Sequence, residues 1–141
     1  MEYDARFFGT HETYFLKAVE RFGEDAALNL MAEVMEANLG SAYSKMKFQK
    51  GKPEDFARVV GERDQSVGLE VSFPVISKDR IVYRFLTDPF PNLRGKVEWR
   101  KLDATYMPFK VRFLLGNEWK YETTQHMWNG DPFTEHVITK I

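Results

Sequence analysis

Apolar residues in the first half of the chain recur every three to four positions, the spacing of helices that pack on a core. The predicted helices cover residues 10–22, residues 24–47 and a shorter segment from Pro53 to between Gly61 and Asp64. Gly23 separates the first two, because glycine readily adopts the left-handed conformation that ends a helix. Gly40-Ser41 interrupts the second pattern and predicts a kink or a division there.

The apolar spacing then changes to two, which predicts strands with one buried face. In the first strand the alternating apolar residues are Val67, Leu69, Val71 and Phe73. A second strand is predicted from Arg80 to Leu86, after a turn. Pro74 has no backbone N–H to donate, so it indicates that the first strand lies at a sheet edge or ends there.

Between residues 87 and 115 the pattern is harder to interpret. Two prolines make residues 87–92 a constrained loop, and residues 93–102 are ambiguous. Residues 103–115 alternate like a strand, but Asp103 as an N-cap, Pro108 near the first turn and the stop at Gly116-Asn117 indicate a helix. We favour the helix, and the strand stays an open alternative.

The last segment, residues 119–141, is predicted to be a β-hairpin. Two strand-like runs flank Asn129-Gly130-Asp131-Pro132, the strongest turn signal in the chain. The hairpin carries His126, His136, Trp119 and Trp128. We expect it to form one wall of any chemical site.

Strand parity tests whether the two histidines can act together. A two-residue turn pairs Thr123 with His136, and a four-residue loop pairs His126 with Glu135. In either register the histidines face opposite sides, and only a three-residue loop or a bulge places both on one face. A two-histidine metal site is therefore not expected. The His126–Glu135 pairing is a usual acid–base arrangement, although an exposed pair on the outer face explains it equally well.

These elements predict a single α+β domain over residues 1–141, with N-terminal helices packed on a mainly antiparallel sheet that the C-terminal hairpin closes. Its 20 basic and 21 acidic residues lack the excess of positive charge that nucleic-acid binding needs. The absence of cysteine excludes thiol nucleophiles and cysteine-bound metals. Without a nucleotide-binding motif, a signal peptide or a long apolar run, we expect no cofactor, a cytoplasmic location and no membrane contact.

Three stretches carry a resemblance to a known family. They are Phe22-Gly23-Glu24-Asp25-Ala26-Ala27, Val82-Tyr83-Arg84-Phe85 leading into Asp88-Pro89-Phe90, and residues 123–131. Their order resembles the L-2-amino-thiazoline-4-carboxylic acid hydrolases, which are similar in pattern to the 4-vinyl reductase domain and to the ligand-binding part of some phenol-sensing regulators. The resemblance implies a pocket between the helices and a curved sheet.

The family's cysteines are missing at the matching positions. Asp88, Asp103 or a near neighbour, and Thr134 stand where the pattern places them. Neither the cysteine nucleophile of the hydrolases nor the cysteine-rich zinc site of the sensors can be carried over.

The candidate chemistry is therefore acid–base catalysis. Asp88, in its proline-constrained loop, and His126 are the main candidates, although Asp88 could also simply open a turn. Asp103 is a further catalytic candidate, with helix capping as its more ordinary role. The residues expected to bind ligand are Trp99, Tyr106, Trp128 and Glu135.

These observations favour a domain that binds a small organic molecule. Whether it is an enzyme stays open, with a cofactor-free hydrolase or lyase as the leading form. The alternatives are a non-catalytic ligand-binding or sensor module, and an accessory subunit of a larger enzyme. A homo-oligomer is compatible with the sequence but not indicated by it.

Overall fold

The computed structural model describes residues 5–141, which form five α-helices, two 3-10 turns and four strands. The helices are α1 (Ala5–Phe22), α2 (Glu24–Ser44), α3 (Pro53–Ser66), α4 (Trp99–Asp103) and α5 (Met107–Leu114). The strands are β1 (Val71–Ile76), β2 (Arg80–Phe85), β3 (Trp119–Gln125) and β4 (Thr134–Lys140). The 3-10 turns are η1 (Pro91–Leu93) and η2 (Met127–Asn129).

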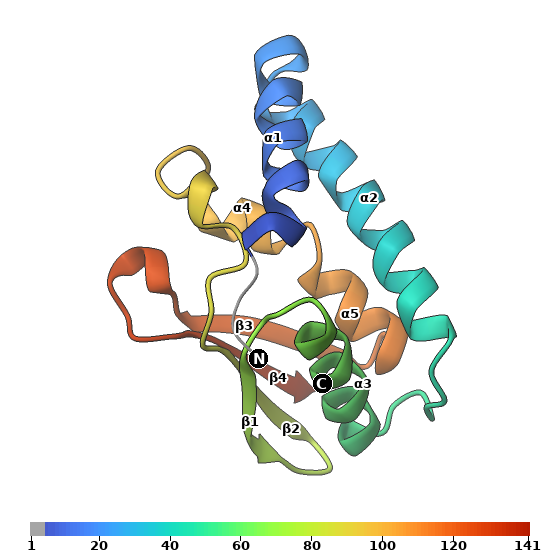
Figure 1. The fold of residues 1–141 in the computed structure, drawn as a ribbon. Helices are drawn as coiled ribbons and strands as arrows, with labels where there is room; N and C mark the ends of the chain where they lie inside the picture. Colours follow the sequence, from blue (N-terminus) through green and yellow to red (C-terminus); the bar gives the residue numbers. More distant parts are fainter. Residues whose placement is uncertain (1–4) are drawn as a thin grey trace.

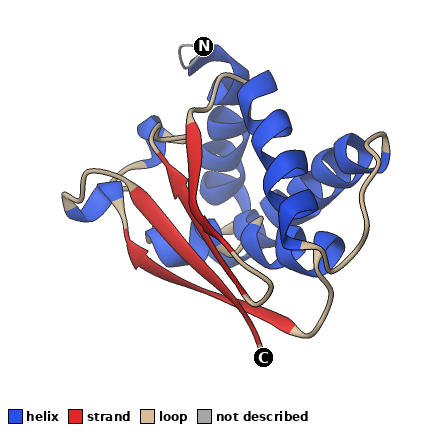
Figure 2. Cartoon of the chain, turned by 90° about the horizontal axis from the view of Figure 1, so that it is seen from below, coloured by secondary structure: helices blue, strands red, loops and turns tan. Residues whose placement is uncertain are grey.

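The four strands form one sheet in the order β1-β2-β4-β3, with every neighbouring pair antiparallel. Helices gather on one face of this sheet, while α1 and α2 form a pair that extends beyond it (Figures 1 and 2). The predicted α+β class and the closing hairpin, β3 with β4, are confirmed. Strand β4 lies inside the sheet, so the hairpin places its second strand beside β2.

The predicted pair of N-terminal helices is present, although α1 begins at Ala5 and not at residue 10, and α2 ends at Ser44 and not at residue 47. Gly23 lies between them with a φ of 88°, as expected of a helix-ending glycine. The predicted division at Gly40-Ser41 is wrong, because α2 runs through both residues to Ser44. A Cβ on Gly40 would lie 3.4 Å from the ring of Phe109. The glycine therefore allows α5 to approach α2 closely.

The first strand begins later than its alternation predicts. Val67 and Leu69 are buried, but their N–H groups both bond to the carbonyl of Asp64 in the turn that ends α3. Their burial therefore reflects this turn and not the pleat of a strand. Pro74 lies in the edge strand β1 at an irregularity between Ser72 and Val75, which confirms the edge position.

The ambiguous segment contains two helices. Helix α5 confirms the helical interpretation of residues 103–115 over Met107–Leu114, with Pro108 in its first turn. The prediction that Asp103 caps this helix is wrong. Asp103 is the last residue of α4, and the residue before α5, Tyr106, makes no capping bond with its side chain.

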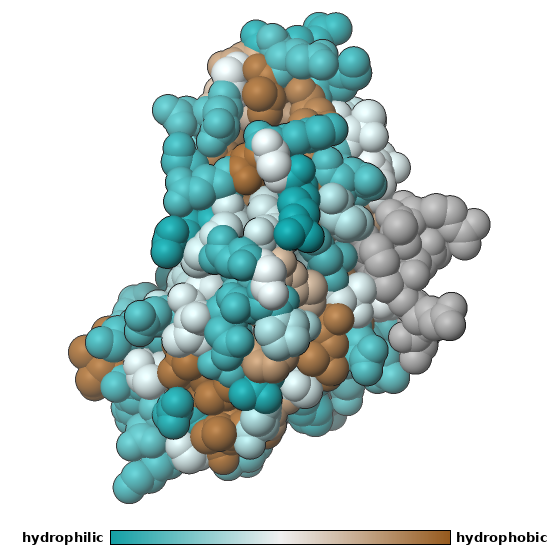
Figure 3. Space-filling view, turned by 90° about the vertical axis from the view of Figure 1, so that its left-hand side faces the viewer, coloured by the Kyte–Doolittle hydropathy of each residue, from teal (hydrophilic) through white to brown (hydrophobic). Residues whose placement is uncertain are grey.

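The core lies between β2 and the helices. Ile81, Tyr83 and Phe85 of β2 are at most 2% exposed, as their shared strand face predicts. Outside the core, apolar side chains are exposed near the far end of the α1–α2 pair, at the top of Figure 3. The exposed members are Tyr14, Phe22, Leu30 and Val34. Within residues 5–141, none of the helices has the length and apolar character needed to cross a membrane.

Candidate functional site

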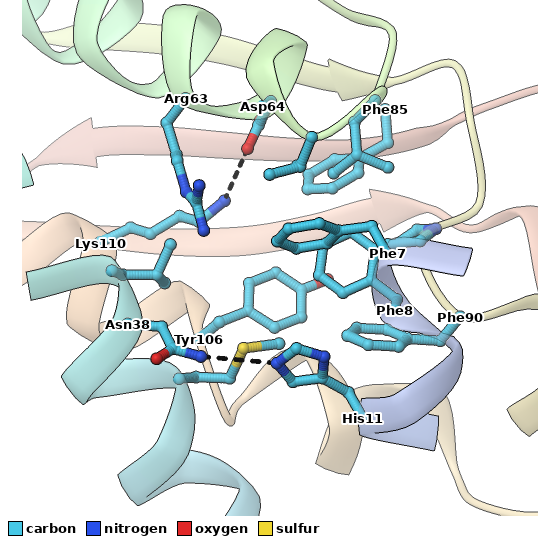
Figure 4. A pocket seen from close by; sticks show the side chains of 15 residues that line it. Phe7, Phe8, His11, Asn38, Arg63, Asp64, Phe85, Phe90, Tyr106 and Lys110 are labelled. Carbon is cyan, nitrogen blue, oxygen red and sulfur yellow. Dashed lines mark hydrogen bonds and ion pairs between the residues drawn. The ribbon is translucent and has the colours of Figure 1, made fainter. Parts of the chain in front are cut away.

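Two neighbouring cavities lie between the helices and the sheet. The large cavity, of about 40 Å³, is lined by α1, α2, α3, β2 and α5 (Figure 4). The small cavity, of about 10 Å³, lies between the Asp88 loop, α4 and the turn of the hairpin. Four residues line both: Phe85, Pro89, Phe90 and Tyr106. The cavities are therefore separated by a shared aromatic wall.

The small cavity gathers five of the seven predicted site residues. They are Asp88, Asp103, Tyr106, His126 and Trp128. A sixth, Trp99, stacks on the imidazole of His126 with 4.6 Å between ring centres. The seventh, Glu135, lies elsewhere. Most of the residues named from the sequence thus lie close together, although the contacts among them differ from those expected.

His126 contacts Asp103 and not Asp88, the other main candidate for acid–base catalysis. Its Nε2 lies 3.6 Å from Asp103 Oδ2, and both side chains are buried. The other carboxylate oxygen, Oδ1, accepts a hydrogen bond of 2.9 Å from the hydroxyl of Tyr106. Asp103 Oδ2 has no hydrogen-bond partner among the described residues. A small polar group could therefore bind between Asp103 and His126.

The backbone determines which nitrogen of His126 carries its proton. His126 Nδ1 accepts a hydrogen bond of 3.1 Å from the N–H of Trp128, and a backbone N–H can only donate. The neutral imidazole therefore carries its proton on Nε2, which faces Asp103. Asp131 holds the turn by accepting a bond of 2.8 Å from the His126 N–H. In this arrangement the Nε2–H of His126 faces Asp103 Oδ2 at 3.6 Å, which is too long for a hydrogen bond.

Asp88 has a structural partner for each of its oxygens. Oδ1 accepts from the N–H of Phe90, two residues on, which is the turn-opening role of aspartate. Oδ2 accepts a bond of 2.7 Å from the indole N–H of Trp128. Asp88 therefore holds the loop against the hairpin, and its oxygens are already engaged.

Glu135 does not pair with His126, so the pairing that a four-residue loop predicts is wrong, and Gln125 lies opposite Glu135. Its carboxylate accepts bonds of 2.7 Å from Arg84 Nε and from the hydroxyl of Thr124. These hydrogen bonds, together with the positive charge of Arg84, lower the pKa of Glu135 against the opposing effect of burial. Glu135 alternates along β4 with inward-facing Thr134 and His136, so it points to the outer face.

The expected separation of the two histidines is also wrong. Thr123 pairs with His136 and Gln125 with Glu135, so β3 contains one extra residue, a bulge. The bulge moves His126 to the inner side, where His136 is fully buried among the rings of Tyr83, Phe85 and Tyr121. No group of metal-binding side chains occurs within residues 5–141.

The large cavity contains a buried charged cluster that the sequence interpretation missed. Lys110 Nζ lies 3.7 Å from Asp64 Oδ1 and donates a bond of 3.1 Å to the hydroxyl of Tyr83. That hydroxyl donates in turn to Asp64 Oδ2. Lys110 and Asp64 are each 3% exposed, and Tyr83 is fully buried. The three residues form a closed triangle of polar groups.

Burial moves both charged groups towards their neutral forms. It lowers the pKa of the Lys110 ammonium and raises the pKa of the Asp64 carboxyl, although their mutual attraction opposes both changes. It also raises the pKa of the Tyr83 and Tyr106 hydroxyls. A proton held by Lys110 is thus less strongly bound than in water, and one on Asp64 is more strongly bound.

Further polar groups line the same cavity. Arg63, next to Asp64 on α3, lines it and lowers the pKa of Lys110 through its charge. His11 from α1 lies 3.4 Å from the amide of Asn38 on α2, and its Nδ1 is buried without a hydrogen-bond partner among the described residues. Figure 4 shows these groups around the rings of Phe7, Phe8, Phe90 and Tyr106.

A signal for the missed cluster was present in the helical spacing. Lys110 occupies a buried position in α5 with Met107, Val111 and Leu114. Asp64 continues the buried row of Phe56 and Val60 in α3. A charged residue where the helical period requires an apolar one indicates a buried ionisable group, and such groups concentrate at functional sites.

Together these features define an α+β domain with two adjoining cavities, each lined by buried ionisable side chains. The sequence matches no family model and no curated protein. Its function therefore has to be inferred from the chemistry of the two cavities.

Proposed function

We propose that this chain is a small-molecule-binding domain whose ligand occupies the large cavity. The observation that carries the proposal is the buried Asp64–Lys110–Tyr83 triangle beside a cavity with aromatic walls. Burying a charged pair rarely adds net stability compared with apolar residues of the same size. Aromatic walls with a few convergent polar groups are typical of ligand sites.

The family resemblance supports the same function. The pocket that it implies lies between helices and a curved sheet, and the large cavity lies between helices and the sheet. The cysteine positions of the family pattern correspond here to residues around the small cavity, namely Asp88, Asp103 or its neighbour, and Thr134. We therefore propose that ligand binding is retained without thiol chemistry.

Acid–base catalysis at the small cavity is the second candidate function. It would make the chain a cofactor-free hydrolase or lyase. The observation in its favour is the Asp103 oxygen that lacks a hydrogen bond and faces the Nε2–H of His126 at 3.6 Å. A carboxylate base beside a fixed donor can move a proton to or from a substrate. The engaged oxygens of Asp88 favour the alternative of a non-catalytic sensor.

A metabolite screen by ligand-observed NMR tests the binding function. Leu39 lines the large cavity, whereas Leu30 lies on the same helix and is exposed outside it. Leu39→Phe should fill the cavity and abolish binding, and Leu30→Phe is the matched control that should retain it. Equal binding to both variants, or no bound metabolite, would contradict the proposal.

The same screen separates the two functions. If the bound metabolite is consumed over hours and Asp103→Asn stops its consumption without stopping its binding, the domain is an enzyme. If the metabolite stays unaltered in the wild type, the domain is a sensor or binding module.

A further inference from the structure

We propose that Lys110 forms an imine with a small 2-oxo acid held in the large cavity. This inference rests on the proposed ligand-binding function of that cavity and adds a covalent step to it. The observation behind it is that an amine, a proton acceptor and a second cation line the same cavity.

The geometry provides a path for the proton that Lys110 must lose to become a nucleophile. Lys110 Nζ donates to the hydroxyl of Tyr83, and this hydroxyl donates to Asp64. A proton can therefore pass from the ammonium through Tyr83 to the carboxylate without entering water. The lowered pKa of Lys110 and the raised pKa of Asp64, both caused by burial, favour the same transfer. Amines desolvated in apolar pockets are activated in this way for attack on carbonyl groups.

The charges around the cavity indicate a ligand that carries a carboxylate. Arg63 and Lys110 bring two cations and Asp64 one anion, so a positive charge is left over. Once Lys110 has passed its proton to Asp64, both of these side chains are neutral. Arg63 is then the one residue of the three that carries a charge. A guanidinium can bind a carboxylate through two parallel hydrogen bonds. The ligand thus needs a carboxylate for Arg63 and a carbonyl for Lys110, which a 2-oxo acid combines on adjacent carbons.

The reaction is a reversible condensation with no redox change. The lone pair of neutral Lys110 Nζ forms a bond to the carbonyl carbon, and the C=O π electrons move to the oxygen, which takes one of the two protons of the attacking nitrogen to become a hydroxyl. This hydroxyl takes up a further proton, from Asp64 by way of Tyr83, and leaves as water while the nitrogen forms the C=N bond. One water molecule is released for each imine.

The size of the cavity limits the ligand. A volume of about 40 Å³ holds roughly three water molecules, because a cavity needs about 10–15 Å³ of such space for each water. This space suits a three-carbon 2-oxo acid and excludes one with an aromatic ring. Pyruvate is therefore the appropriate probe.

Borohydride trapping tests the inference directly. Incubation of the wild-type chain with pyruvate and sodium borohydride should reduce the imine to a stable 1-carboxyethyl amine on Lys110. Intact-mass measurement should show one adduct per chain, and peptide mapping should locate it at Lys110. A chain that gains no adduct, or adducts spread over exposed lysines such as Lys101, overturns the proposal.

Matched variants separate a specific reaction from surface chemistry. Asp64→Asn/Lys110→Met removes the amine and its counter-charge together and should lose the adduct, whereas Lys101→Met should keep it. Arg63→Gln should raise the pyruvate concentration for half-maximal trapping about tenfold or more, but leave trapping of propionaldehyde, which has no carboxylate, unchanged. An equal effect on both probes would contradict the carboxylate role of Arg63.

The proposed function can survive failure of this inference. If pyruvate or another metabolite binds the wild type but not Leu39→Phe, and no adduct forms at Lys110, the cavity binds its ligand without the covalent step. If nothing binds and nothing is trapped, both proposals fail.

Discussion

The indole N–H of Trp128 donates a hydrogen bond of 2.7 Å to Asp88 Oδ2 and so joins two residues that lie 40 positions apart. The bond ties the Asp-Pro loop to the turn of the hairpin, and both segments line the small cavity. Asp88 and Trp128, both expected site residues, therefore hold these two segments together.

Disrupting this bond should reduce stability in a coupled way. Asp88→Asn and Trp128→Phe should each lower the free energy of unfolding by about 1–3 kcal/mol, because each leaves a partly buried polar group without its partner. The double variant should be destabilised by less than the sum of the two. Urea denaturation of all four proteins measures the coupling, and strict additivity would show that the bond contributes little.

Loss of the hydroxyl should change the free energy of unfolding differently at two buried tyrosines. Tyr106→Phe removes the donor to Asp103 and should cost about 1–3 kcal/mol. Tyr43→Phe is the matched control, because the Tyr43 hydroxyl is buried with no hydrogen-bond partner among the described residues. It should be neutral or stabilising. Equal losses in denaturant unfolding would contradict the assignment of the two hydroxyls.

Replacing only one member of the charged pair Asp64–Lys110 should strongly lower the free energy of unfolding. Asp64→Asn and Lys110→Met each leave a buried polar partner behind, and each should cost about 3–5 kcal/mol. The combined variant should be less destabilised than the sum of the single variants. Thermal unfolding measures this difference, and a fully additive double variant would show that the two side chains do not interact.

His136 should make the protein sensitive to mild acid. Burial lowers its pKa from 6.5 to about 4, so the folded state resists protonation while the unfolded state accepts a proton readily. This contribution to stability is complete above pH 6.5 and is lost as the pH falls from 6.5 to about 4, with a limit of about 3 kcal/mol. The comparison is urea unfolding of wild type and His136→Gln between pH 7 and pH 4. The variant should lose less stability over this range, and parallel curves would exclude a role for His136.

Glu135 should affect stability and not ligand binding. Glu135→Gln weakens the bonds to Arg84 and Thr124 on the outer sheet face and should cost about 1 kcal/mol. Ligand-observed NMR should show unchanged binding of any metabolite found for the wild type. A loss of binding in a folded variant would place the ligand on the opposite face of the sheet from both cavities.

Periodicity predicted the elements well and the contacts between them poorly. The row Ile81, Tyr83 and Phe85 was visible because an alternating pattern needs only local information. By contrast, the bulge that places His126 beside Asp103 depends on how β3 pairs with β4. No residue type in β3 predicts it. Lys110 was overlooked because its charge suggested solvent, whereas its helical position lies among buried residues.

The bulge between Thr123 and Gln125 absorbs one extra residue in β3. Without Thr124, Gln125 would still lie opposite Glu135, now in regular alternation, and His126 would still follow on the inner face. In an alignment of related chains, a one-residue gap at this position would therefore be compatible with the Asp103–His126 contact.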